Sequence, residues 1–324
     1  MSRRIRLALT GECMVELVPD PGRKDMLRRS FSGDTLNTAV YVSRLGGVET
    51  SYLSAVGTDS LSDAMLRFWQ QEGIDASLTR RLPGAVPGLY MIQTDENGER
   101  SFLYWRSASA ARLCYSGRDA DGILDALASF DGVYLSGISL AVFFEDGRTR
   151  LLERLAQLAG KVPVFFDANF RPSLWGGSRD EAVERARPWY RNILPLCSML
   201  FLSPEEAEAF DDMKGCAGPE DTAVRLASRM RPGAELIMKD GSRPCLLWDA
   251  KRMLRVPPLP VENVVDTTAA GDSFAAAYLH ARLHGMSPEQ AARRGHRLAA
   301  AVIREPGAVI PVNHMPEELI HESF

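Results

Sequence analysis

Short apolar runs alternate with longer segments of helical periodicity along most of this chain. The runs 5–10, 51–56, 132–135, 162–166, 199–202 and 236–238 have the length and composition of buried strands. After the second run, Leu61, Met65 and Trp69 recur at helical spacing, and Gly73 stands where a helix would end. Such alternation predicts a mostly parallel sheet covered by helices, which is an α/β fold.

Composition narrows the class of protein. The 324 residues are 45% hydrophobic, which allows one large domain or two smaller ones. The formal net charge is -4, so no nucleic-acid partner is expected, and local cationic groups must hold any anionic ligand. No apolar run has membrane-spanning length, and Glu12 and Glu16 interrupt the first apolar stretch, which favours a strand over a signal peptide. The five scattered cysteines indicate neither a disulfide framework nor a zinc site, and a cytoplasmic location fits best.

One segment departs from the alternation. Residues 88–94 and 99–106 flank Asn97-Gly98 and read as a β-hairpin. Period-two spacing puts Phe102, Tyr104 and Arg106 on one face of the second strand, where Tyr90 can join them. Such a face suits either a flap over a polar site or a solvated hairpin, and the pattern alone does not choose.

The segment from Asp266 to Phe274 reads as a strand-to-helix turn. Ala269, Ala270 and Gly271 let a ligand approach the backbone, and an amphipathic helical pattern follows. Free N–H groups and the positive end of the helix dipole make this turn an anion site. Asp272 can cap the helix or accept a proton from an attacking hydroxyl, and its spacing alone favours the cap.

Two long segments resemble the signatures of the ribokinase-like carbohydrate kinases, often called the PfkB family. The first runs from Ser32 to Ala39 and continues in Leu45-Gly46-Gly47 and Gly57-Thr58-Asp59, and the second runs from Asp266 to Leu279. The resemblance implies one ribokinase-like three-layer α/β/α domain over residues 1–324. Its small β lid would come from segments near 12–33 and 88–106. It also implies ATP and Mg²⁺, allows a monovalent cation such as K⁺, and suggests a homo-oligomer formed through the lid.

Further segments resemble the 2-keto-3-deoxygluconate kinases within that family. They are Gly11 to Leu17, Pro87 to Tyr90, Tyr134 to Leu140 and Arg294 to His296. That resemblance implies ATP-dependent phosphorylation of the 6-hydroxyl of a small sugar acid. Other sugars or sugar acids, such as 2-keto-3-deoxygalactonate, fructose or ribose, remain alternatives, as does a catalytically silent sugar-binding protein. No G-x-x-x-x-G-K-[ST] run occurs, and no G-x-G-x-x-G follows the first strand, which disfavours P-loop and dinucleotide enzymes.

The resemblance also assigns roles. Asp272 would be the general base, beside a backbone anion hole at Ala270, Gly271 and Asp272, with Ala269 where the family usually has glycine. The substrate would meet Gly33, Asp34, Asn37, Arg171 and the hairpin residues Tyr90, Tyr104 and Arg106, with Arg106 pairing with its carboxylate. ATP would meet Asn169, Arg171, Ser203, Lys239, Gly241, Ala269, Gly271 and Gly307. Glu206 would help to organise Mg²⁺ through water, although Ser203-Pro204-Glu205-Glu206 also reads as a capped helix start. His280 and His284 are expected on an exposed helix face rather than in a metal site.

Overall fold

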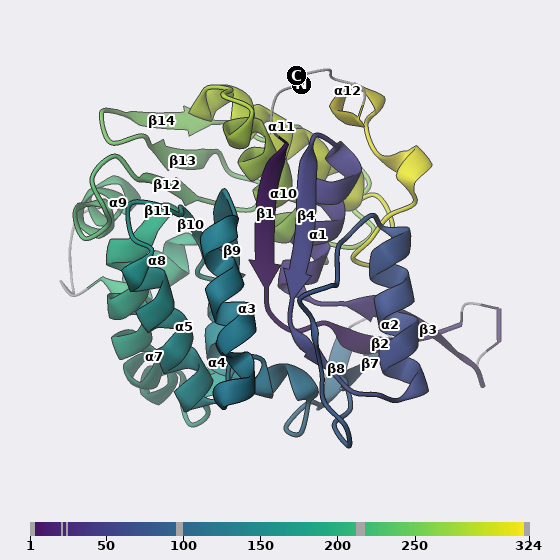
Figure 1. Ribbon diagram of the computed structural model, residues 1–324. Helices are drawn as coiled ribbons and strands as arrows, with labels where there is room; N and C mark the ends of the chain where they lie inside the picture. Colours follow the sequence, from purple (N-terminus) through teal and green to yellow (C-terminus); the bar gives the residue numbers. More distant parts are fainter. Residues whose placement is uncertain (1–3, 21, 24, 95–99, 212–217, 321–324) are drawn as a thin grey trace.

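The computed structural model describes residues 4–20, 22–23, 25–94, 100–211 and 218–320. Within them, eight strands form a central sheet in the order β14-β13-β12-β11-β10-β9-β1-β4 (Figure 1). Pairing is parallel from β12 to β4 and antiparallel at β13 and β14. The strands are β1 (Ile5–Thr10), β4 (Val48–Leu53), β9 (Gly132–Ser136), β10 (Val164–Asp167), β11 (Cys197–Leu202), β12 (Glu235–Met238), β13 (Cys245–Trp248) and β14 (Met253–Val256).

Helices cover both faces of this sheet. Along β10, Val164 and Phe166 pack into one hydrophobic core, whereas Phe165 packs into the other. The first core is closed by α3 (Asp121–Ala126), α4 (Gly137–Val142), α5 (Glu145–Gln157), α7 (Arg179–Ile193), α8 (Pro204–Phe210) and α9 (Pro219–Ser228). The second is closed by α1 (Asp34–Leu45), α2 (Ser60–Gln71), α10 (Ala270–Leu283), α11 (Pro288–Val302) and α12 (Glu317–Ile320). The predicted mostly parallel α/β architecture is confirmed.

A second, four-stranded sheet extends from one end of the core, and we call it the lid (Figure 1). Its order is β3-β2-β7-β8, with β2 (Met14–Pro19), β3 (Leu27–Ser32), β7 (Gly88–Thr94) and β8 (Arg100–Trp105). β7 and β8 pair antiparallel, and Tyr90 lies opposite Tyr104, so the predicted pairing and shared face are confirmed. The expected Asn97-Gly98 turn lies outside the described residues. A small ladder of β5 (Ala55–Val56) and β6 (Arg80–Arg81) and the short helix α6 (Pro172–Trp175) complete the elements.

The structure corrects three expectations. The run 51–56 is divided between β4 and β5, and the antiparallel strands β13 and β14 were not predicted. The expectation that His280 lies on an exposed face is wrong, because α10 packs between α1 and α11 and leaves the side chain fully buried. Its Nε2 lies 2.8 Å from the carbonyl oxygen of Gly46, and burial lowers its pKa to about 4. The neutral imidazole is a structural contact between helices.

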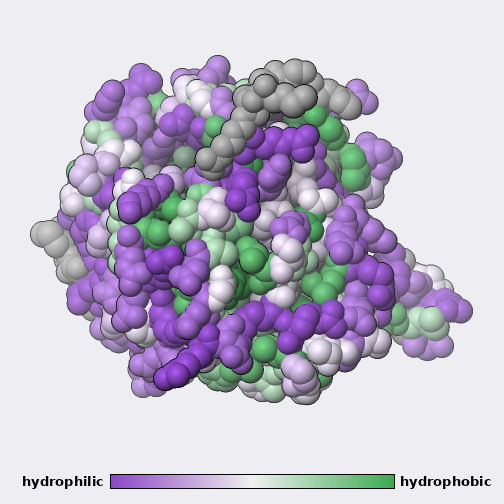
Figure 2. Space-filling view, viewed as in Figure 1, coloured by the Kyte–Doolittle hydropathy of each residue, from purple (hydrophilic) through white to green (hydrophobic). Residues whose placement is uncertain are grey.

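The surface carries the polarity expected from the composition. On the face shown in Figure 2, hydrophilic residues cover most of the surface, and hydrophobic residues form small separate groups. In the described part of the chain, no helix is both long and apolar enough to cross a membrane. The described cysteines Cys13, Cys114, Cys197 and Cys245 are buried free thiols.

Candidate active site

A polar cleft of about 510 Å³ opens where the carboxyl ends of the parallel strands face the lid. This volume and this edge of the sheet are typical of small-molecule sites. The core wall follows β10, β11 and β12 and includes the start of α10, and the lid wall comes from β2, β7 and β8. Most predicted site residues line this cleft, namely Gly33, Asp34, Asn37, Tyr90, Tyr104, Asn169, Arg171, Ser203, Glu206, Lys239, Ala269, Gly271 and Asp272.

The turn before α10 is held by Asp266. Its Oδ1 accepts the backbone N–H of Thr268 at 3.0 Å and the Thr268 hydroxyl at 2.6 Å. Ala269 then adopts φ 60° and ψ 12°, a left-handed conformation that favours glycine. This strained residue turns the chain so that α10 begins at the floor of the cleft.

The start of α10 leaves two backbone donors available. The N–H of Ala270 bonds to the carbonyl of Thr267 at 3.2 Å. The N–H groups of Gly271 and Asp272 form no hydrogen bond within the described part of the chain. A helix start with free donors attracts anions, so the N–H groups of Gly271 and Asp272 are available to hold one, whereas the N–H of Ala270 is already engaged.

The side chain of Asp272 does not cap the helix. It accepts no hydrogen bond from a backbone N–H of the described residues, and its Oδ2 instead accepts Nδ2 of Asn37 at 2.8 Å. Asn37 lies on α1, which packs against α10. This contact between the two helices directs the carboxylate of Asp272 into the cleft, where it can contact a ligand.

Charges crowd the cleft floor around Asp272. Asp34 accepts Nδ2 of Asn169 at 2.9 Å, and Asp167 pairs with Nζ of Lys239 at 2.6 Å. Burial, followed by the neighbouring Asp34 carboxylate, raises the pKa of Asp272 to about 7. The amide of Asn37 and the Lys239 ammonium act in the opposite direction. A carboxyl with this pKa can both take up and release a proton near neutrality.

Gly33 and Lys239 lie close to other backbone. A Cβ on Gly33 would be 2.1 Å from the carbonyl oxygen of Glu12, so glycine is required by the neighbouring chain rather than by a ligand alone. A Cβ on Gly271 would be 3.3 Å from Nζ of Lys239, which places that ammonium beside the anion site. The pairing with Asp167 therefore holds a cation where a bound anion would lie.

Ser203 and Glu206 form the predicted capping box at the start of α8. Ser203 Oγ accepts the Glu206 N–H at 3.2 Å, and Glu206 Oε2 accepts the Ser203 N–H at 2.7 Å. Oε1 of Glu206 also accepts the N–H of Phe170 at 2.6 Å. Burial and the nearby Asp167 carboxylate raise the pKa of Glu206. Each oxygen retains a further lone pair, so Glu206 can still accept a hydrogen bond from a metal-bound water.

The lid places aromatic side chains over the cleft. The rings of Tyr90 and Tyr104 lie 5.8 Å apart, and the Tyr90 hydroxyl donates to Glu16. Arg106 lies 5.9 Å from the centre of the Tyr104 ring but is not among the residues that line the cleft. Its guanidinium forms an ion pair with Glu12.

An apolar pocket of about 720 Å³ lies on the other side of the same turn. It is lined by Gly241, Thr267 and Ala270, by the helix residues His296 and Ala299, and by the segment 257–261. Thr267 lines both cavities, so the polar cleft and the apolar pocket meet at the turn before α10. A flat apolar group in one cavity can thus be joined to an anion at the boundary.

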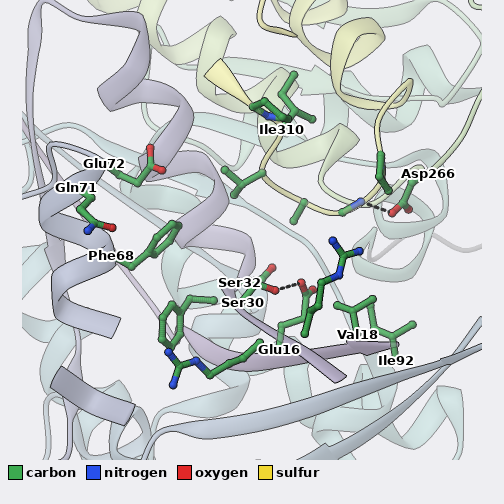
Figure 3. Close-up of a pocket in the computed structure, with 18 of the residues that line it drawn as sticks. Glu16, Val18, Ser30, Ser32, Phe68, Gln71, Glu72, Ile92, Asp266 and Ile310 are labelled. Carbon is green, nitrogen blue, oxygen red and sulfur yellow. Dashed lines mark hydrogen bonds between the residues drawn. The ribbon is translucent and has the colours of Figure 1, made fainter. Parts of the chain in front are cut away.

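Gly307 lies elsewhere. Its N–H donates to Oδ2 of Asp266 at 2.7 Å, and both residues line a third cavity of about 900 Å³ between the lid, α2 and residues 306–311. Figure 3 shows this cavity, with Glu16 and Ser30 on the lid wall and Phe68 on α2. Gly307 is thus connected to the active-site turn through Asp266 without lining either the polar cleft or the apolar pocket.

Sequence reasoning missed three contributors to the site. Asp167 ends β10 at the edge where ligands bind, and that position could have signalled its role. The proline-rich run at 257–260 supplies much of the apolar pocket, and its lack of charge is visible in the sequence. Glu12 is an acid directly after a buried strand, yet only the structure shows its partner.

A comparison with known families identifies this arrangement. The pfkB family carbohydrate kinase model matches residues 4–315. The chain belongs to this family. The pfkB kinase is 43% identical over 320 residues to the 2-dehydro-3-deoxygluconokinase of Dickeya dadantii, which covers 96% of this chain and 98% of that one. It is 38% identical over 322 residues to the 2-dehydro-3-deoxygluconokinase of Haemophilus influenzae, with 97% and 99% coverage.

Solved structures confirm the fold of the pfkB kinase. A putative ribokinase II from E. coli in complex with ATP and Mg²⁺ superposes with a TM-score of 0.80 at 20% identity, covering 97% of each chain. Similarity at this identity establishes the ribokinase-like three-layer fold. The family membership and this fold confirm the two signatures read from the sequence.

Proposed function

We propose that this pfkB kinase transfers the γ-phosphoryl group of ATP to the 6-hydroxyl of 2-keto-3-deoxygluconate. The observation that carries the proposal is the position of Asp272, which lies in the polar cleft beside free backbone donors, just after the turn where that cleft meets an apolar pocket. The relatives named 2-dehydro-3-deoxygluconokinase, at 38% and 43% identity over nearly the whole chain, support this acceptor. The buried free thiols fit a cytoplasmic setting.

Asp272 acts as the general base in this proposal. The hydroxyl oxygen attacks the γ-phosphorus, the bond from that phosphorus to the ADP oxygen breaks, and the hydroxyl proton passes to the Asp272 carboxylate. A pKa of about 7 for Asp272 makes it a stronger base than an ordinary aspartate while leaving it largely ionised at slightly alkaline pH. The amide of Asn37 keeps the accepting oxygen oriented.

The developing charge on the phosphoryl group meets fixed donors. The N–H groups of Gly271 and Asp272 point from the start of α10, and the Lys239 ammonium lies beside Gly271. Arg171 lines the same cleft and can approach from the strand side. Phosphoryl transfer depends mainly on positioning and charge stabilisation, which this set of groups supplies.

ATP fits the two cavities in one orientation. The apolar pocket takes the adenine, and the phosphates reach the turn shared by both cavities, next to Asn169 and Lys239 on the cleft side. Mg²⁺ prefers oxygen ligands and usually binds through phosphates, a few carboxylates and water. Glu206 and Asp167 supply such carboxylates, and the ion would neutralise phosphate charge there. A K⁺ site would lie near the Asp266 and Gly307 contact, which joins the turn to the C-terminal segment.

The lid selects the acceptor. Tyr90 and Tyr104 cover the polar cleft opposite Asp34 and Asn37, which offer hydrogen-bonding groups to sugar hydroxyls. Arg106 lies at the border of the cleft beside the Tyr104 ring and pairs with the carboxylate of the sugar acid. Arg106→Ala should raise KM for sugar acids more than for neutral sugars.

A coupled ADP-release assay tests the proposal directly. The panel contains 2-keto-3-deoxygluconate, its galactonate epimer, gluconate, fructose and ribose. Preference for a neutral sugar refutes the acid assignment. Asp272→Asn should lower kcat by about 10²- to 10⁴-fold and still bind ATP in calorimetry. Asp125→Asn, on an exposed residue of α3, serves as the matched control and should keep wild-type turnover. Near-wild-type turnover in Asp272→Asn removes this residue as the base.

We also propose that two copies pair through the lid. Leu103 and Trp105 alternate with the cleft-facing residues of β8 and are 40% and 56% exposed. β8 is the last strand of the described lid sheet, and an exposed apolar edge strand favours association with another chain. Light scattering should report a dimer that Trp105→Lys shifts towards monomer, whereas Val224→Lys on α9 should have no effect. A wild-type monomer contradicts the proposal.

A further inference from the structure

The chain passes between core and lid four times, and Glu12 lies at the point where these passages meet. The first passage, residues 11–13, joins β1 to β2, and Glu12 is its middle residue. The second joins β3 to α1 at Gly33, the third enters β7 at Gly88, and the fourth leaves β8 through residues 106–109. These positions form the base on which the lid is mounted.

Glu12 contacts each of the other three passages. A Cβ on Gly33 would lie 2.1 Å from its carbonyl oxygen, and a Cβ on Gly88 would lie 2.6 Å from its Oε1. Nη2 of Arg106 donates to its Oε2. The main chain and side chain of Glu12 therefore fill the space at the base of the lid.

The ion pair of Glu12 and Arg106 is almost enclosed by protein. The side chain of Glu12 is 1% exposed and that of Arg106 is 13% exposed. Separating such a pair leaves a buried charge without compensation, which is strongly unfavourable. Arg106 is therefore expected to stay on Glu12 when a ligand binds, rather than to exchange one carboxylate for another.

The guanidinium nevertheless retains free donors. Nη2 is engaged by Glu12, and within the described part of the chain the guanidinium of Arg106 makes no other hydrogen bond. A guanidinium carries five N–H donors in a rigid plane, so fixing one edge also fixes the direction of the others. Because the group lies 5.9 Å from the ring of Tyr104, the remaining donors are held at the border of the polar cleft.

The pair is also incompletely satisfied, which a purely structural salt bridge avoids. Oε1 of Glu12, Oγ of Ser109 and Nε of Arg112 are buried, and within the described residues none of the three has a hydrogen-bond partner. Buried polar atoms without partners are rare and are often found where a structure serves a function.

We infer that Glu12 is a positioning residue for acidic acceptors, which holds Arg106 at the base of the lid with its remaining donors available to the carboxylate of the sugar acid. The inference rests on the proposed function, because it assumes an acceptor that carries a carboxylate. It assigns to Glu12 a role in acceptor affinity that is exerted through Arg106 and not by contact with the reacting atoms.

Glu12→Gln tests the inference, because it keeps the shape and an acceptor oxygen but removes the charge. The matched control is Glu72→Gln, since Glu72 also forms a largely buried ion pair with an arginine, Arg44, at 2.7 Å. In Glu12→Gln, KM for the sugar acid should rise roughly tenfold, while kcat and KM for ATP change little. Glu72→Gln should lose stability to urea and keep the wild-type KM.

A double-mutant cycle with Arg106→Ala separates positioning from a general effect. If Glu12 acts through Arg106, adding Glu12→Gln to Arg106→Ala should raise KM no further. An unchanged KM in Glu12→Gln, or effects that add in the double variant, would overturn the inference. Should Glu12→Gln fail to fold, Glu12→Asp keeps the charge, withdraws the carboxylate by one methylene and is judged by the same criteria. A wild type that phosphorylates only neutral sugars overturns the proposed function, whereas a wild type active on the acid with no effect of Glu12 overturns only this inference.

Discussion

The Asp272 carboxyl should govern the acidic side of the pH profile. Burial and Asp34 raise its pKa to about 7, and a general base must be ionised to act. Only about a tenth of a group with this pKa is ionised one unit below it, and about nine tenths one unit above it. The value of kcat/KM should therefore rise about tenfold from pH 6 to pH 8.

Neighbouring charges should shift this midpoint in opposite directions. Asp34 raises the pKa of Asp272, so Asp34→Asn should move the acidic limb to lower pH. Lys239 lowers the same pKa, so Lys239→Met should move the limb to higher pH. Both substitutions should also lower kcat/KM at every pH. Such a uniform decrease does not change the pH at the midpoint of the acidic limb.

The measurement is the initial rate of ADP release from pH 5 to 9 at constant ionic strength, with ATP and the acceptor both well below their KM values. The ratio kcat/KM reports ionisation in the free enzyme, which is the state described by the structure. Asp125→Asn should retain the wild-type midpoint. A midpoint near 4, where an ordinary aspartate titrates, would refute the assignment of this limb to Asp272. Shifts of the same sign in both variants would refute the electrostatic reasoning.

Two further predictions concern the backbone around the site. Ala269→Gly should stabilise the fold by about 0.5–1 kcal/mol in urea unfolding, because relief of the left-handed strain exceeds the greater entropy of glycine in the unfolded chain. Ala270→Gly, one residue later in the helix, should lower the free energy of unfolding by a similar amount. Equal losses of stability in both variants would contradict the strain proposed at Ala269. Gly33→Ala should cost about 1–3 kcal/mol and raise KM for the acceptor, because its Cβ would lie 2.1 Å from the Glu12 carbonyl oxygen. An unchanged stability and KM would show that the neighbouring chain yields easily.

Periodicity predicted the parallel core well, because strands that are buried on both faces form continuous apolar runs. The strands β13 and β14 were not predicted because each has only four residues, and along β14, the edge strand, only Val256 is buried. The exposed position expected for His280 is wrong because α10 packs between α1 and α11. Its helix is covered on several sides, so a polar residue there satisfies its hydrogen bonds against a neighbouring helix rather than in water.

Most residues that line the polar cleft could be predicted one by one, where a sequence motif contained them. The turn at Asp272 and the aromatic face of the lid are local patterns, and the structure brings most of their residues to one cleft. The partners of those residues are contacts over long sequence separations, such as Asp167 with Lys239 and Glu12 with Arg106. Periodicity contains no information on such pairs, because each depends on how whole elements pack.

The polar cleft and the apolar pocket are lined by different parts of the chain, and this separation affects how the fold can change the sugar that it phosphorylates. The polar cleft takes one wall from the lid, whereas the residues of the apolar pocket all come from positions 241–303. Under the proposed function, the residues that choose the acceptor and those that bind the nucleotide therefore lie in largely separate stretches of the sequence. Exchanging residues 12–33 and 88–106 together for those of a relative with another acceptor should redirect specificity and leave nucleotide affinity intact. The lid is then the part of this enzyme on which selection for a new sugar can act without rebuilding the machinery that handles ATP.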